Sequence, residues 1–103
     1  MRHTINMNVN DQVFAALASA PRRQIIAFLS QTALSTADLA ERFAMTSPAV
    51  SRHLAVLLRA GLVESERAGQ RVLYRLKRDT LLNALSRFAS EVDGPLRTPR
   101  NAI

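Results

Sequence analysis

The stretch from Thr46 to Val63, TSPAVSRHLAVLLRAGLV, decides the fold, because it contains one helix together with its start and stop signals. Its apolar residues recur at helical spacing and form one stripe, which consists of Val50, Leu54, Leu57 and Leu58. Thr46 or Ser47 can cap the first backbone amides, and Pro48 fits the first turn. Gly61 supplies the left-handed residue that ends a helix. The sequence therefore predicts one helix of about four turns.

The face opposite the stripe is small, hydroxylic and basic, and it carries Pro48, Arg52, Ala55 and Arg59. Short side chains near the N-terminus of the helix let its backbone approach another surface, and Ser51 and Arg52 can donate hydrogen bonds to that surface. A helix that enters the major groove of DNA needs these features. The pattern indicates a DNA-reading helix.

The composition of the chain suits one compact domain, since 48% of its 103 residues are hydrophobic and 21% are charged. Fourteen Lys and Arg residues against eight Asp and Glu residues give a formal charge of +6, which favours a polyanionic partner such as nucleic acid. Solubility alone is the alternative explanation of this charge. The chain has no Cys, no apolar run of membrane-spanning length and no hydrophobic signal sequence, so we expect no membrane partner and a cytoplasmic protein.

The sequence of the N-terminal half predicts two helices. Residues 1–10 have no periodic pattern and are expected to form a flexible arm. A short helix is expected from Asp11 to Ser19, and Pro21 then starts a second helix that ends near Ser30 and buries Ile25, Ile26, Phe28 and Leu29. Arg22 and Arg23 lie in its first turn, where the helix dipole does not favour cations, so they predict either an external anion or a local ion pair.

A capping box predicts the third helix, because Ser35 is followed three residues later by Asp38. This helix is expected to run through Phe43 and to bury Leu39 and Phe43. Only a tight turn then separates it from the helix that begins near Thr46, and two helices joined in this way form a helix-turn-helix.

The C-terminal half predicts a hairpin and a last helix. Val72, Tyr74 and Leu76 alternate with Arg71, Arg75 and Lys77, while Leu73 falls on the polar face and does not fit the pattern. Residues 63–67 can pair with this strand across a three-residue turn, which consists of Ala68, Gly69 and Gln70. A helix from about Thr80 to Val92 has more apolar residues than one small core needs, and Gly94 and Pro95 are expected to end it. The domain is therefore assigned to residues 11–92 and a tail to residues 93–103.

The order of the predicted elements and four sequence motifs together resemble the ArsR-type winged helix-turn-helix repressors of bacteria. In chain order, the motifs are APRRQIIAFL, LSTADLAERF, SRHLAVLLRAGLV and AGQRVLYRL. The resemblance implies a mainly α (α+β) fold with five helices and a two-stranded wing, and a homodimer that binds double-stranded DNA. It implies base contacts from Ser47, Pro48, Ser51 and Arg52, and contacts to the DNA backbone from the helix and the wing, which involve Thr46, Arg59, Arg67, Gly69, Gln70 and Arg71. His53 belongs to the same word, but its position beside the apolar stripe favours a packed histidine over a base reader.

The same resemblance implies that the first and last helices pair in the dimer. The last helix places Leu81, Leu85, Phe88 and Val92 at spacings of four, three and four residues, which is typical of a helix seam. The predicted interface adds two residues of the first helix, Val13 and Leu17.

Metal sites of the family can be compared with this chain position by position. Where arsenic and cadmium sensors have a Cys-x-Cys word, this chain has Ser35-Thr36-Ala37-Asp38, and the last helix lacks the His and carboxylate pairs of zinc sensors. The resemblance is thus to the metal-independent branch, which includes small autorepressors, and no cofactor or metal is expected. The sequence does not name an effector ligand, an operator or a regulated gene.

Two classes of function stay open. The first is a sequence-specific repressor that binds a pseudo-palindromic operator, and the second is a small helical protein-interaction module whose basic surface is merely solvated. An enzyme is disfavoured, because the chain lacks Cys, clustered His and a Gly-rich phosphate loop. Ser51 and His53 lie two residues apart on one helix and so point in different directions.

Overall fold

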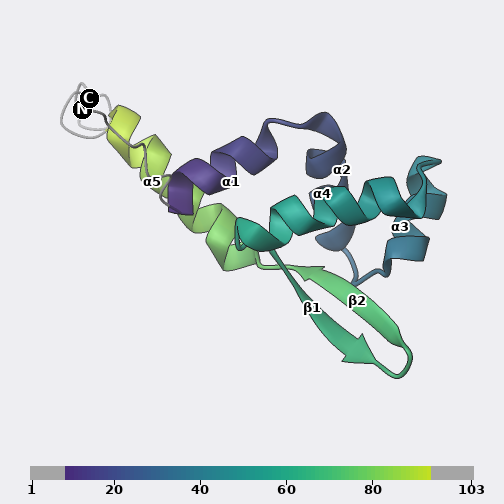
Figure 1. Cartoon of the computed structure of the whole chain (residues 1–103). Coiled ribbons are helices and arrows are strands. Elements are labelled where there is room, and N and C mark those ends of the chain that lie inside the picture. The colour runs from purple at the N-terminus through teal and green to yellow at the C-terminus, as the bar shows by residue number, and fades with distance from the viewer. Residues whose placement is uncertain (1–8, 94–103) are drawn as a thin grey trace, which may run out of the picture.

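The computed structural model describes residues 9–93, which form five helices and one antiparallel pair of strands (Figure 1). The elements in chain order are α1 (Val9–Leu17), α2 (Ala20–Leu29), α3 (Thr36–Phe43), α4 (Ser47–Arg59), β1 (Val63–Ala68), β2 (Arg71–Leu76) and α5 (Arg78–Asp93). The predicted winged helix-turn-helix is confirmed. Helix α1 begins at Val9, two residues before the predicted start at Asp11; the rest of the predicted arm, and all of the tail after Asp93, lie outside the described residues.

Helices α2, α3 and α4 each begin at a hydroxyl cap. Ser19 caps α2, and Thr46 caps α4 by accepting a hydrogen bond from the amide of Ala49 at 3.2 Å. Ser35 and Asp38 form the predicted capping box, in which each side chain accepts from the backbone amide of the other residue at 3.1 Å. These caps satisfy amides that the helices leave free, so local sequence fixes where the three helices start.

The core lies around α4, which runs through the middle of the molecule (Figure 1). The largest fully buried side chains come from α1, α2, α3, α4 and the loop before β1. They are Val13, Ile25, Leu39, Val50, Leu54, Leu57 and Leu62. Two residues predicted to be buried are not: Leu58 is 39% exposed and Phe28 is 38% exposed. Leu58 follows Leu57 and points about 100° around the helix from it, so it lies at the edge of the stripe. Phe28 instead packs edge-on against Phe43 at the surface, with ring centroids 5.1 Å apart.

The hairpin of β1 and β2 extends from the helical body as the wing (Figure 1). Ala68 pairs with Arg71, so the turn has two residues and not the three predicted. Gly69 has a φ of +66°, which lets the chain reverse this tightly. The wing is joined to the body through Tyr74, whose amide donates to the carbonyl of Leu34 at 2.8 Å and whose carbonyl accepts from the Leu34 amide at 3.1 Å.

Helix α5 starts two residues earlier than predicted and passes beside α1 before it extends beyond the body (Figure 1). Phe14 of α1 packs edge-on against Phe88 of α5, with ring centroids 5.6 Å apart. Four large apolar side chains of α5 stay exposed, namely Leu82, Leu85, Phe88 and Val92. We call these four residues the α5 surface. None of the described helices is long and apolar enough to cross a membrane.

The predicted dimer residues divide into two groups. Leu85, Phe88 and Val92 belong to the α5 surface, whereas Val13 is completely buried inside the domain, so its assignment to an interface was wrong. Leu17 and Leu81 are half-buried against the same core. Leu82 was not among the predicted interface residues, but it is 52% exposed. The difference arises because α1 turns one apolar face toward α4, which the periodicity of α1 alone cannot reveal.

Candidate nucleic-acid interface

The first two turns of α4 present the four predicted base-reading residues to solvent. Ser47, Pro48, Ser51 and Arg52 are all exposed, while Val50 and Leu54 of the same turns are buried in the core. Thr46, predicted to meet the DNA backbone, uses its hydroxyl to cap the helix. The outcome is a rigid helix whose outer face is free, which is the requirement for insertion into a groove.

The turn between α3 and α4 fixes how this face is displayed. Ala44 ends α3 in the left-handed conformation with a φ of +53°, and it is the one residue other than glycine among residues 9–93 with a positive φ. The amide of Met45 then donates to the carbonyl of Ala40 at 3.2 Å. In Figure 1 this turn and the tip of the hairpin lie at the same end of the molecule, far from the free end of α5.

His53 is half-buried on α4 and packs against Arg22 of α2, with its Nδ1 3.4 Å from a guanidinium nitrogen. Because a guanidinium only donates hydrogen bonds, this contact requires an unprotonated Nδ1. Burial lowers the pKa of His53 below its ordinary value of 6.5, and the positive charges of Arg22 and Arg52 lower this pKa further. A neutral, packed histidine follows, as the position beside the stripe predicted.

Arg22 and Arg23 form no ion pair within residues 9–93, and their side chains instead bind carbonyl groups of α1. The Nε of Arg22 donates to the carbonyl of Ala16 at 2.7 Å, and a terminal nitrogen of Arg23 donates to the carbonyl of Leu17 at 2.6 Å. Both guanidinium groups therefore cap the C-terminal end of α1, where helix carbonyls lack partners and cations are favoured. Sequence reasoning missed this role because it considered only the helix that contains the two arginines.

The wing carries three cations, and a fourth, Lys77, directly follows it; their surroundings differ. Arg67 is exposed and makes no ion pair within residues 9–93, and the tip residues Gly69 and Gln70 are exposed beside it. Arg75 forms an ion pair with Glu66 of the other strand at 2.7 Å. Lys77 follows the end of β2 and is exposed.

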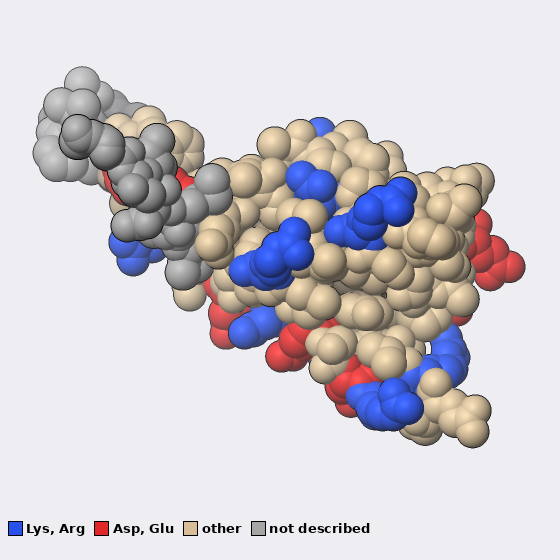
Figure 2. All heavy atoms as spheres, in the orientation of Figure 1, with Lys and Arg blue, Asp and Glu red and all other residues tan. Residues whose placement is uncertain are grey.

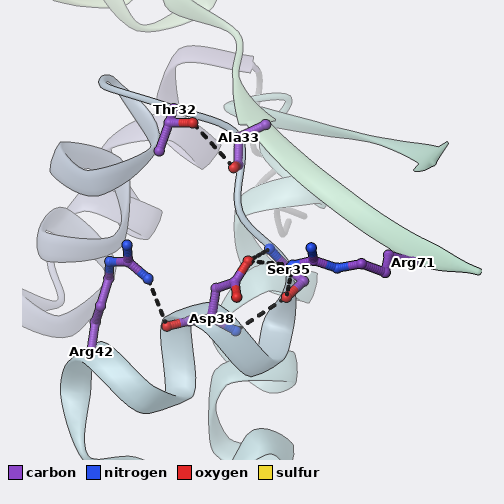
Figure 3. Close-up of polar contacts among 6 residues, drawn as sticks. All are labelled: Thr32, Ala33, Ser35, Asp38, Arg42 and Arg71. Atoms are coloured by element: carbon purple, nitrogen blue, oxygen red, sulfur yellow. Dashed lines mark hydrogen bonds and ion pairs between the residues drawn. The ribbon is translucent and has the colours of Figure 1, made fainter.

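Arg71 differs from the other wing cations because it reaches back to α3 (Figure 3). One of its terminal nitrogens lies 2.6 Å from Oδ2 of Asp38 and 3.1 Å from Oγ of Ser35. The carboxylate of Asp38 also accepts the amide of Ser35 and thus serves the helix cap and the arginine together. The hydrogen bonds from Ser35, followed by the charge of Arg71, lower the pKa of Asp38 below its ordinary value of 3.8. Arg71 was predicted to meet DNA phosphate, but in this structure its guanidinium is bound within the protein.

Acidic and basic side chains are distributed unevenly over the surface of the protein. Figure 2 shows Lys and Arg side chains on the helical body with little acidic surface beside them, whereas acidic and basic side chains lie next to one another along the hairpin. The exposed cations on α4 are Arg52 and Arg59, and neither forms an ion pair within the described residues. Arg52 and Arg59 on α4 and Arg67 on the wing are therefore among the exposed cations that have no acidic partner within residues 9–93.

Residues 20–65 match the family model described as bacterial regulatory protein, arsR family. The chain is also 30% identical over 89 residues to the transcriptional repressor SdpR of Bacillus subtilis, an alignment that covers 84% of this chain and 99% of that protein. The chain belongs to the ArsR family. A second relative is the HTH-type transcriptional regulator KmtR of Mycobacterium tuberculosis. It is 38% identical to this chain over 88 residues, which cover 82% of this chain and 66% of KmtR.

Solved structures agree with this assignment. The ArsR-like transcriptional regulator from Rhodococcus sp. RHA1 superposes with a TM-score of 0.74 at 33% identity, covering 82% of this chain and 83% of that chain. The relatives are transcriptional regulators and not enzymes, so the expectation of a non-catalytic protein is confirmed. As an ArsR-family protein with a winged helix-turn-helix, the chain is a DNA-binding transcriptional regulator.

Proposed function

We propose that this ArsR-family regulator is a sequence-specific repressor that binds a pseudo-palindromic operator as a homodimer in the cytoplasm. The observation that carries the proposal is the exposed first half of α4, where Ser47, Pro48, Ser51 and Arg52 all face solvent on a helix anchored in the core. Of these side chains, Arg52 can donate two parallel hydrogen bonds to O6 and N7 of guanine. Pro48 has no donor, so its contact would be apolar, for instance to a thymine methyl group.

Repression is favoured because SdpR, a relative that the chain covers almost completely, is a transcriptional repressor. A homodimer is favoured by the α5 surface, whose four large apolar side chains are more exposed than a soluble monomer commonly leaves together. A two-fold dimer would place two α4 helices on one face of the duplex, which is the reason for expecting a pseudo-palindromic site.

We further propose that repression does not depend on a metal ion. The chain has no Cys. Within residues 9–93, no three His, Cys, Asp or Glu side chains lie close enough together to hold a metal. The stretch 35–38 is already occupied by the capping box and Arg71.

The test begins with the genomic fragments that the purified protein retains, because these supply the operator. Affinities for this operator and for a duplex of random sequence are then measured over a salt series. We expect Arg52→Ala to cost about 1 to 3 kcal/mol on the operator and little on the random duplex, because a base contact specifies sequence. Arg67→Ala should weaken both and make the salt slope shallower by about one unit, because it removes one phosphate contact.

Two outcomes would contradict the proposal at different levels. Equal losses on both duplexes for Arg52→Ala would show that Arg52 does not read bases. A wild-type protein that shows no saturable, salt-sensitive binding to any duplex would favour the second class of function, a protein-interaction module with a merely solvated basic surface.

A further inference from the structure

The wing of this protein is attached to the helix-turn-helix at two separated points of β2. The first is the backbone pairing of Tyr74 with Leu34, directly before α3. The second is the side chain of Arg71, which belongs to the last residue pair before the turn, next to the tip. Residues 34–38 therefore hold the hairpin near its middle and near its tip, and the second attachment consists of side chains alone.

We propose that Arg71, Asp38 and Ser35 form a clasp that positions the wing for DNA binding, and that Arg71 acts through this clasp and not by contacting phosphate. The proposal rests on the DNA-binding function proposed above. Arg71 is thus a positioning residue, and the phosphate contact of the wing belongs to Arg67, which has no acidic partner within the described residues.

The geometry of the clasp supports this assignment. Asp38 is held in place independently of Arg71, because its Oδ2 accepts a hydrogen bond from the amide of Ser35 and its own amide donates to Ser35 Oγ, both at 3.1 Å. A carboxylate fixed by a helix cap is a preorganised partner for a guanidinium, and Arg71 approaches it at 2.6 Å. Figure 3 shows the arginine side chain extended from β2 toward the first turn of α3. If the guanidinium of Arg71 turned away toward a phosphate, it would give up two hydrogen bonds and leave Asp38 without its cation.

The clasp links the two parts of the protein that touch DNA. Helix α3 carries the capping box and leads through the Ala44 turn into α4. A wing held at the start of α3 has a fixed orientation relative to the reading helix, so both can meet one duplex without further ordering. Loss of the clasp would leave the Tyr74 pairing intact and release only the tip, at a cost in DNA affinity because the tip must then be ordered on binding.

A double-mutant cycle tests the clasp, with a duplex of random sequence as the probe so that no operator needs to be known. The variants are Arg71→Gln, Asp38→Asn and both together; Asn keeps an oxygen that can accept the Ser35 amide. Removal of a negative charge from Asp38 favours DNA binding in either background, and the cycle subtracts this effect. We expect Asp38→Asn to be about two- to fivefold more damaging in the wild-type background than in the Arg71→Gln background, as for a partly exposed ion pair. The salt slope of Arg71→Gln should equal that of the wild type.

A phosphate contact predicts the opposite coupling. Asp38→Asn would then free Arg71 and tighten binding more in the wild-type background, and Arg71→Gln would make the salt slope shallower by about one unit. Either this result or a coupling of zero would overturn the clasp. If the wild type itself does not bind the duplex, the proposed function fails and not merely the clasp.

Two controls separate positioning from a general effect on folding or charge. The ion pair of Glu66 and Arg75 lies within the hairpin, so a cycle of Glu66→Gln and Arg75→Gln makes the same charge changes without touching α3 and should show no coupling in DNA affinity. In the free protein, amide NMR shifts of Gly69 and Gln70 should move together in Arg71→Gln and Asp38→Asn, while the urea midpoint changes little. Unmoved tip amides in both variants would also overturn the proposal.

Discussion

At the scale of single residues, the partner of a charged group decides its role, and that partner is often distant in sequence. Arg22 and Arg23 cap α1 although they lie in the first turn of α2, because only two residues separate the helices and α1 has no basic residue in its own last turn. Arg71 likewise binds a carboxylate 33 residues away. Arg52 and Arg59 have no such partner among the described residues, and so are available to DNA.

His53 yields a pH prediction at this scale. Its pKa is lowered in the folded state, so between pH 6.5 and that lower value the unfolded chain binds more protons than the folded protein. Stability should therefore fall as the pH falls through this window, and be fully restored above pH 6.5. We expect His53→Gln, which keeps an acceptor for Arg22, to lose this dependence. Unfolding free energies from urea titrations between about pH 7.5 and about pH 5 would check it.

The comparison of the two titrations isolates this residue. Carboxylates and the other histidine, His3, contribute equally to both proteins, so only the difference between wild type and variant reports on His53. Parallel curves over the whole range would contradict the prediction.

At the scale of elements, the helix-turn-helix is specified mostly by its boundaries. The caps at Ser35 and Thr46 start α3 and α4, while left-handed residues follow at Ala44 and Gly61. Gly61 has a φ of +74° and suits its position, whereas Ala44 adopts a φ of +53° in spite of its Cβ. The tight turn between two helices packed on the same core imposes this conformation on an alanine.

These two turn residues predict opposite effects on stability. Ala44→Gly should raise the free energy of unfolding by up to about 1 kcal/mol, because relief of the left-handed conformation exceeds the added freedom of the unfolded chain. Gly61→Ala should lower it by about 1 kcal/mol. A Cβ at position 61 would lie 3.9 Å from Thr80 Cγ2, so space is not the cause of the loss. Urea unfolding of both variants provides the measurement, and changes of the same sign would refute the argument.

At the scale of the whole molecule, the protein has two ends with different chemistry. The α3–α4 turn and the wing tip lie at one end, while α5 carries its exposed apolar side chains toward the other (Figure 1). Polar residues, among them Asn83, Ser86 and Arg87, cover another face of α5. This division suits a protein that would use one end for DNA and the other for a second copy of itself.

The α5 surface predicts the assembly state. A second copy would bury Leu82, Leu85, Phe88 and Val92, so a charge placed among them should separate the subunits. We expect Leu85→Glu to sediment as a monomer at micromolar concentration, where the wild type sediments as a dimer. Ser86→Glu adds the same charge to the neighbouring polar face and should stay dimeric. If Leu85→Glu is as dimeric as the wild type, the α5 surface is not the interface.

The sequence by itself determined the order of elements, because period, caps and glycines act within a few residues: the helix after Thr46, the capping box at Ser35 and the alternation in β2 all occur as predicted. It also determined the exposed face of α4, since that face follows from the buried stripe. Tertiary structure alone decided the burial of Val13, the exposure of Phe28, the capping of α1 by Arg22 and the attachment of Arg71 to Asp38. Each of these depends on which elements pack together, and a charged side chain takes the partner that the fold brings within reach.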